Sequence, residues 1–268
     1  MNDLRKYLST CLLATASLLF GASPAWAQVT LGDAADFSVL GATVTCTTSV
    51  IAGDVGSTGA FTNTGCTITG AMPPATNAAA VGAYADFLDA YAALDKQTCQ
   101  FNLPAVISRN AQLEPGVYCT EAALSATGVV LTLDGKGDPN AVWIFRVGTN
   151  SNLTGALAGT GFTVSMINGG QACNVFWRVA EAVELTDSVF KGTILAGAAI
   201  TTTRGTVAGR ALARAAVTIT GTSVIGCDAL SPDKSCKPKR HKSGKSDKSG
   251  KSDKSGKSGK SHRSPWSR

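Results

Sequence analysis

Histidine is the most informative absence from residues 28–230 of this sequence. Both histidines, His241 and His262, lie close to the C-terminus. The central part of the chain therefore lacks the usual general base of nucleophilic catalysis and the commonest metal ligand. Acidic side chains do not cluster in register as a catalytic carboxylate pair would, and the cysteines lack the C-x2-C spacing of zinc sites. We predict that the protein is not an enzyme and that it holds no metal and no cofactor.

The sequence also lacks a hydrophobic run long enough to cross a bilayer, which takes about 20 residues. The N-terminus comes nearest, because Arg5 and Lys6 precede a short apolar stretch over residues 8–20. Ala25-Trp26-Ala27 then provides a small-x-small cleavage site. This order is typical of a secretory signal. We predict a signal peptide over residues 1–27, no transmembrane segment and a secreted, extracellular protein.

Positive charge is scarce outside the C-terminal segment. By count, residues 231–268 contain 13 Lys/Arg and 3 Asp, a net charge of +10, within repeats of Lys, Ser, Gly and Asp. Trp266 is their one large apolar residue. Such a composition buries too little apolar surface to offset the entropy of ordering. We predict a disordered basic tail over residues 231–268 and one mildly acidic folded domain over residues 28–230, where by count 9 Lys/Arg meet 14 Asp/Glu.

The sequence contains eight cysteines. Cys11 would leave with the signal peptide, and export permits disulfides. Spacing alone does not determine how the others connect. Our prediction pairs Cys46 with Cys66, Cys99 with Cys119 and Cys173 with Cys227, and it leaves Cys236 in the tail without a partner.

A regular repeat runs through the central part of the chain. Residues of one kind recur at every seventeenth position, as in Val183, Ile200 and Val217, or Gly192, Gly209 and Gly226, or Val44 and Phe61. A fainter 32-residue step aligns Arg146-Val147 with Arg178-Val179 and Leu153-Thr154 with Leu185-Thr186. Fixed apolar and glycine columns are typical of a β-solenoid. An antiparallel sandwich is the alternative, but that fold has no reason to keep 17-residue columns.

One stretch interrupts the repeat. Pro73-Pro74 and a candidate N-cap, Thr76, precede an alanine-rich run. Apolar residues recur in this run at the spacing of one helix face: Val81, Tyr84, Ala85, Leu88, Tyr91 and Ala92. We predict one amphipathic α-helix over about residues 76–98, lying along the flank of the solenoid.

Alternation along each strand predicts two columns of outward side chains. If Val183 and Leu185 point inward, Glu184 and Thr186 point outward. The repeat then places in the first column Thr45, Thr62, Asn152, Glu184, Thr201 and Thr218, and in the second column Thr47, Thr64, Thr154, Thr186, Thr203 and Thr220. Rungs would be about 4.7–4.9 Å apart, and residues i and i+2 about 6.6–6.8 Å apart. A rigid grid of threonine hydroxyls and methyls can order water in a lattice-like array, as adsorption to ice requires. Glu184 interrupts this grid.

Several stretches carry a family resemblance. They are LGDAADFSVL (31–40), IAGDVG (51–56), LEPGVY (113–118), LDGKGDPNAVWIF (133–145), NGGQACNVFWRV (168–179) and VAGRALA (207–213). Together they resemble the ice-binding-like family, the DUF3494 type of antifreeze protein. The resemblance implies a mainly β fold, namely a discontinuous right-handed β-solenoid (triangular β-helix) with one long α-helix packed along its side. It also implies adsorption to ice by one flat face without a cofactor.

We therefore predict a secreted, monomeric ice-binding protein that limits ice growth or recrystallisation, with ice or ordered water as its partner. The alternative is a cell-surface or matrix adhesion module whose cationic tail binds anionic polysaccharide or surfaces, an attraction that salt would weaken. We expect no specific binding of nucleic acid. A polysaccharide-active enzyme is disfavoured, because histidine and clustered acids are lacking.

Overall fold

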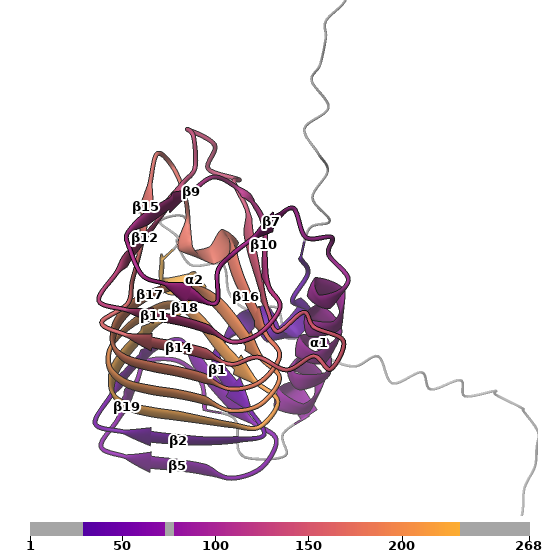
Figure 1. Cartoon of the computed structure of the whole chain (residues 1–268). Helices are drawn as coiled ribbons and strands as arrows, with labels where there is room; N and C mark the ends of the chain where they lie inside the picture. Colours follow the sequence, from indigo (N-terminus) through magenta and orange to yellow (C-terminus); the bar gives the residue numbers. More distant parts are fainter. Residues whose placement is uncertain (1–28, 73–77, 231–268) are drawn as a thin grey trace, which may run out of the picture. The chain divides into compact units, whose positions relative to one another are not determined.

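The computed structural model describes residues 29–72 and 78–230, which belong to one unit. The predicted signal peptide, the candidate N-cap Thr76 and the predicted basic tail lie outside these residues. The described fold is mainly β, and its strands pair in parallel with strands of successive coils (Figure 1). Val183 pairs with Ile200 and Ile200 with Val217, so the repeat columns of the sequence are columns of the sheet.

The strands form three parallel stacks, which we call the first, second and third faces. The first face contains β8 (Val106–Ile107), β11 (Leu124–Thr127), β14 (Leu157–Thr160), the starts of β17 (Val183–Ala196), β18 (Ile200–Ala213) and β19 (Ala216–Ile225), then β2 (Thr43–Thr47) and β5 (Phe61–Thr64). The second face contains β9 (Ala111–Leu113), β12 (Val130–Asp134), β15 (Thr163–Ile167), later parts of β17, β18 and β19, then β3 (Val50–Ala52) and β6 (Thr67–Ile68). The third face contains β7 (Phe101–Asn102), β10 (Gly116–Thr120), β13 (Trp143–Val147), β16 (Val175–Val179), the ends of β17 and β18, then β1 (Phe37–Gly41) and β4 (Asp54–Ser57).

The winding of the chain is interrupted. The N-terminal strands β2 and β3 pair with the C-terminal strand β19, and β1 pairs with β18. The chain then passes through α1 (Ala78–Asp95) before it resumes at β7, at the other end of the stack. A helix of 18 residues is about 27 Å long, which matches the height of five or six rungs at about 4.8 Å each. The helix is therefore long enough to carry the chain from one end of the stack towards the other.

α1 begins and ends close to where the sequence predicts, but its apolar stripe is different. It ends at Asp95 and not near residue 98, because Lys96 and Gln97 donate to carbonyls three residues back and close a tighter turn. The buried side chains are Ala80, Ala83, Phe87, Ala90, Tyr91 and Leu94. Of the predicted stripe, only Tyr91 is buried, and Val81 is 48% exposed. The small alanines let the helix approach the sheet closely. A pattern of large apolar residues alone therefore does not identify the buried side of the helix.

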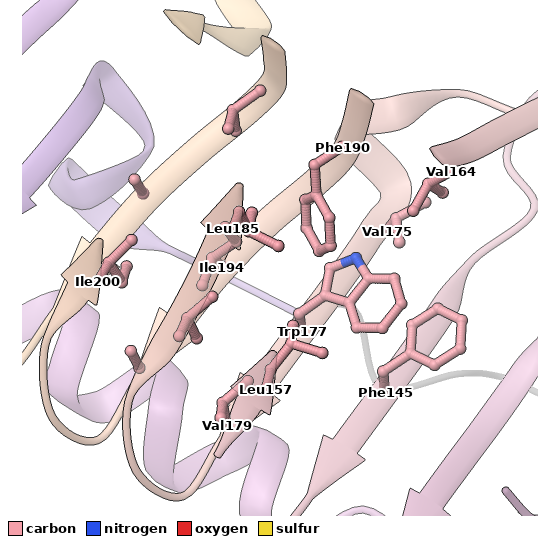
Figure 2. Packing of buried hydrophobic residues seen from close by; sticks show 14 of the residues in the cluster. Phe145, Leu157, Val164, Val175, Trp177, Val179, Leu185, Phe190, Ile194 and Ile200 are labelled. Carbon is pink, nitrogen blue, oxygen red and sulfur yellow. The ribbon is translucent and has the colours of Figure 1, made fainter. Parts of the chain in front are cut away.

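Two hydrophobic cores result from this arrangement. One fills the interior between the three faces, where the rings of Phe145 and Trp177 stack with their centroids 3.8 Å apart and Phe190 lies 4.9 Å from Trp177 (Figure 2). The other lies between the outer side of the third face, the helix and the N-terminal 3-10 helix η1 (Gly32–Asp36), and it includes Phe87 and Leu195. The sheet of the third face is thus covered on both sides.

All three predicted disulfides are present: Cys46–Cys66, Cys99–Cys119 and Cys173–Cys227. The first connects β2 to the coil of β5 and β6, at one end of the stack. The second connects β10 to the segment just before β7, at the other end. The third joins the short helices η2 (Ala172–Asn174) and α2 (Cys227–Leu230). Coils at the ends have a neighbour on one side only, so the first two disulfides strengthen the parts of the stack with the fewest hydrogen bonds between strands.

A cluster of charged side chains connects the C-terminal end of α1 to the third face. Asp95 accepts contacts from Arg146 at 3.1 Å and from Arg178 at 3.0 Å. The Arg178 side chain is 1% exposed, and burial lowers its pKa, although Tyr91 and Asp95 oppose that effect. The guanidinium groups of Arg178 and Arg214 each lie 4.6 Å from the centre of the Tyr91 ring. One carboxylate therefore compensates two arginines that the helix covers.

Replacement of Asp95 by Asn should destabilise the domain strongly. The change leaves the buried Arg178 without its carboxylate, and uncompensated buried charges cost about 3–5 kcal/mol. Urea denaturation should show a free energy of unfolding lower by about 3 kcal/mol. Asp89→Asn is the matched control, because Asp89 lies exposed on the same helix and should change stability by less than about 0.5 kcal/mol. Equal stability of the two variants would contradict the role of the cluster.

In the seven coils from β11 to β5, a single residue turns the corner between the first and second faces. In register, these residues are Gly128, Gly161, Asp187, Arg204, Gly221, Thr48 and Gly65, and each has a positive φ. Glycine adopts this left-handed conformation without strain, whereas a β-branched residue does so at a cost. Thr48, at φ 44°, is therefore the most strained of the set.

Thr48→Gly should stabilise the protein. Relief of about 1–2 kcal/mol of left-handed strain outweighs the entropy cost of glycine, about 0.5–1 kcal/mol. Thermal unfolding should show Tm raised by about 2 °C. Thr43→Gly makes the same change on the same segment, at the exposed start of β2, and should lower Tm instead, because glycine weakens a strand. A lower Tm for Thr48→Gly would show that the corner imposes no strain.

Candidate functional site

The first face presents two columns of outward side chains with a defined register. Burial alternates along its strands: Val183 and Leu185 are buried, and Glu184 is exposed. The second column is threonine in every rung from β11 to β5: Thr127, Thr160, Thr186, Thr203, Thr220, Thr47 and Thr64. Each of these threonines directly precedes the left-handed corner residue of its coil. The corner therefore keeps the column straight at the edge of the face.

The first column is threonine in only part of the stack. From β11 to β5 it reads Ser125, Ala158, Glu184, Thr201, Thr218, Thr45 and Thr62. Both columns are threonine in the adjacent rungs of β18, β19, β2 and β5. We call these residues the threonine block: Thr201, Thr203, Thr218, Thr220, Thr45, Thr47, Thr62 and Thr64. The block crosses the junction at which the N-terminal and C-terminal strands meet.

The structure corrects the position predicted for Thr154. Thr154 lies in the loop after β13, where the Asn150 side chain accepts from its backbone nitrogen and donates to its carbonyl. The rung opposite Glu184 and Thr186 contains Ala158 and Thr160, so Asn152 is also absent from the column. The 32-residue repeat does align Arg146 with Arg178, which are paired on the third face. It fails beyond them because the loop 148–156 is longer than the matching link 180–182.

Sequence reasoning missed Thr127 and Thr160, although a local signal marks both. Each is followed by glycine, as are Thr64 and Thr220. The Thr-Gly pair alone does not identify the column, because it also occurs outside it, at Thr58-Gly59, Thr69-Gly70 and Thr154-Gly155.

Charge lies at the borders of the threonine block. Glu184 projects from the rung above Thr201. At the corner, Arg204 donates to both carboxylate oxygens of Asp187, at 2.6 and 2.8 Å. This contact lowers the pKa of Asp187, chiefly through the hydrogen bond. The block itself consists of uncharged hydroxyl and methyl groups held at the spacing of the rungs.

The second face does not offer a comparable grid. Its outward residues include Val50 and Val189, which are 48% and 45% exposed, together with Thr206, Ser223 and Lys191. Residue size and polarity change from rung to rung, so bound water would meet no constant spacing. Of the two faces that the helix leaves open, the first is the regular one.

We searched the described residues for grouped metal ligands and for membrane-spanning helices. In residues 29–72 and 78–230, no group of three or more His, Cys, Asp or Glu side chains is arranged to hold a metal ion. Every cysteine in that part of the chain forms a disulfide. No helix there reaches the length and apolar character that a membrane crossing requires.

The fold and this face define a class of protein: a stack of parallel β-coils that presents a regular threonine surface. The chain belongs to the ice-binding-like family, whose model matches residues 27–225. The resemblance carried by the sequence motifs is thereby confirmed.

Named relatives and solved structures agree. An ice-binding protein of Nostoc sp. (strain HG1) is 34% identical over 187 residues, which cover 65% of this chain and 64% of that protein. Ice-binding protein 1 of Shewanella frigidimarina is 40% identical over 103 residues, 38% of this chain but 11% of its own length. The ice-binding protein structure from Antarctomyces psychrotrophicus superposes with a TM-score of 0.66 at 30% identity, over 74% of this chain and 97% of that one. The chain thus spans less than two thirds of these two named relatives.

Proposed function

We propose that this protein binds ice through the threonine block of the first face and thereby limits ice growth or recrystallisation outside the cell. The observation that carries the proposal is the register: four adjacent rungs each place two threonines outward. Membership of the ice-binding-like family supports the same activity.

The physical basis is a rigid, repeated array of hydroxyl and methyl groups. Threonine is stiff at χ1. The rungs of β18, β19 and β2 are fixed by backbone hydrogen bonds on both sides, and buried residues such as Val217 and Ile219 lie beneath them. Water held on the array therefore adopts spacings set by the protein. Little side-chain freedom is lost on adsorption, which favours binding. The interaction requires no cofactor and no catalytic step.

The stacked coils also support a more detailed description of the fold. We infer a discontinuous right-handed β-solenoid of triangular cross-section with α1 along its side, as expected for this family. The pairing of β19 with β2 and the contacts of α1 with β1, β13, β16 and β17 favour this description.

Secretion is part of the proposal. The predicted signal peptide over residues 1–27 supports it, and so do the three disulfides, which persist in oxidising compartments. The sequence also supports a second role, in which the +10 tail attaches the domain to anionic polysaccharide or cell surfaces. The tail would then localise the ice-binding domain without taking part in its grid.

Replacing Thr203 and Thr220 together by Lys should abolish ice binding without unfolding the domain. Two long charged side chains in adjacent rungs disrupt the water array. Activity in a recrystallisation assay should require at least about tenfold more protein, as a loss of about 1.4 kcal/mol implies. Thr206→Lys is the matched control, since Thr206 projects from the second face on the same strand, and it should retain activity. The proposed face would be wrong if the control lost as much activity as the double variant.

Glu184→Thr should increase activity. It would add a further complete rung, beside Thr186, to the threonine block and remove the charge at its border. We expect roughly a twofold gain in recrystallisation inhibition at equal concentration, a change of about 0.4 kcal/mol. Glu181→Thr provides the comparison, because Glu181 lies before β17 and outside the columns. Identical activities for both variants and the parent would show that Glu184 does not border the binding surface.

A further inference from the structure

A cavity separate from the first face lies where the N-terminal segment crosses the third face. Its volume is about 590 Å³, which is within the range of small-molecule sites. Its wall is mainly apolar and includes Leu31, Val142, Phe176 and the Cys173–Cys227 disulfide. A single cationic side chain, Arg210, also lines it.

Arg210 is buried but incompletely paired. It is 8% exposed, and its Nε and Nη2 both donate to the Ala35 carbonyl, at 2.9 and 2.7 Å. Nη1 makes no hydrogen bond, and no carboxylate of the described residues forms an ion pair with this guanidinium. Burial lowers the pKa of Arg210, while the negative charges of Asp228 and Asp36 act in the opposite direction.

Two other arginines of the third face, unlike Arg210, have a carboxylate partner. Arg146 and Arg178 both contact the Asp95 carboxylate. Buried charges generally occur with a partner, because desolvation is expensive. Thr193 lies between Phe176 and Arg210 in register, and its hydroxyl is buried without a hydrogen-bond partner. The region around the cavity thus contains unused polar groups within an apolar surrounding.

We propose that this cavity binds a small organic anion, a carboxylate attached to an apolar body of about the size of a medium-chain fatty acid. The carboxylate accepts from Nη1 of Arg210, and the apolar body lies against Phe176, Val142 and Leu31. The anion compensates the buried cation. The apolar part of the wall, which also contains Asn140 and Asn174, favours an anion with a hydrophobic body over an inorganic ion. This binding is independent of the ice-binding proposal, since the residues belong to different faces.

Calorimetric titration of the purified whole protein with sodium octanoate tests the proposal. We expect one saturable site with Kd on the order of 1 mM or tighter. Octanol, which has the chain without the charge, and acetate, which has the charge without the chain, should each bind at least about tenfold more weakly, as the loss of a charge-assisted hydrogen bond or of apolar burial implies. Recrystallisation inhibition should be the same with and without octanoate.

Two variants address the site from different directions. Arg210→Met removes the cation and should weaken octanoate binding at least about tenfold, whereas Arg109→Met, an exposed arginine elsewhere, should leave it unchanged. If Arg210→Met fails to fold by circular dichroism, Val142→Trp fills the cavity while keeping the guanidinium and should also abolish binding. The proposal is overturned if octanoate shows no saturable binding, if octanol binds equally well, or if folded Arg210→Met or Val142→Trp binds normally. Binding that appears only after deletion of residues 231–268 would also overturn it, because the tail would then be the occupant.

Discussion

Parallel hydrogen bonding between equivalent positions of successive coils is the constraint on which the other features of this protein depend. Because Thr203 pairs with Thr220 and Thr220 with Thr47, an outward threonine in one rung lies directly beside those in the next. The left-handed residue after each threonine turns the seven coils from β11 to β5 at the same point. A slip of one residue would exchange buried and exposed positions throughout a face, so the cores and the surface grid are determined together.

Local patterns in the sequence predict much of this architecture. The repeat columns identify the coils from Val183 to Val224, and the disulfide pairs and the helix position agree with the structure. The prediction fails where an insertion separates two coils. Arg146 and Arg178 remain aligned, but the long loop 148–156 changes the spacing before β14, and Thr154 therefore falls outside the grid. Pairing depends on backbone contacts, and a step counted along the chain does not register the length of a loop.

The candidate site is likewise predicted only in part by the sequence. The sequence identifies the threonines on either side of the junction, because each lies within an uninterrupted repeat. It does not reveal that Thr218 and Thr45 are neighbours in space, since that contact depends on the return of the chain through α1. Nor does composition show that the helix covers the third face and leaves the regular first face open. The sequence also does not identify the buried side of α1. Ala80, Ala83 and Ala90 let the helix lie close to the sheet, but small alanines contribute little to a hydrophobic pattern.

The interrupted winding has a consequence for the order in which the molecule matures. Ser49 and Thr222 are 173 positions apart, yet the Ser49 hydroxyl accepts from the Thr222 backbone. As the chain is synthesised, β2 and β3 emerge early but gain their second neighbour only after β19 has emerged. Closing so long a loop is entropically unfavourable and slow compared with the pairing of adjacent coils. The threonine block is thus among the last surfaces to be completed, because its two halves join only through the pairing of β19 with β2. The complete threonine block therefore forms only after the whole domain, through β19, has been synthesised.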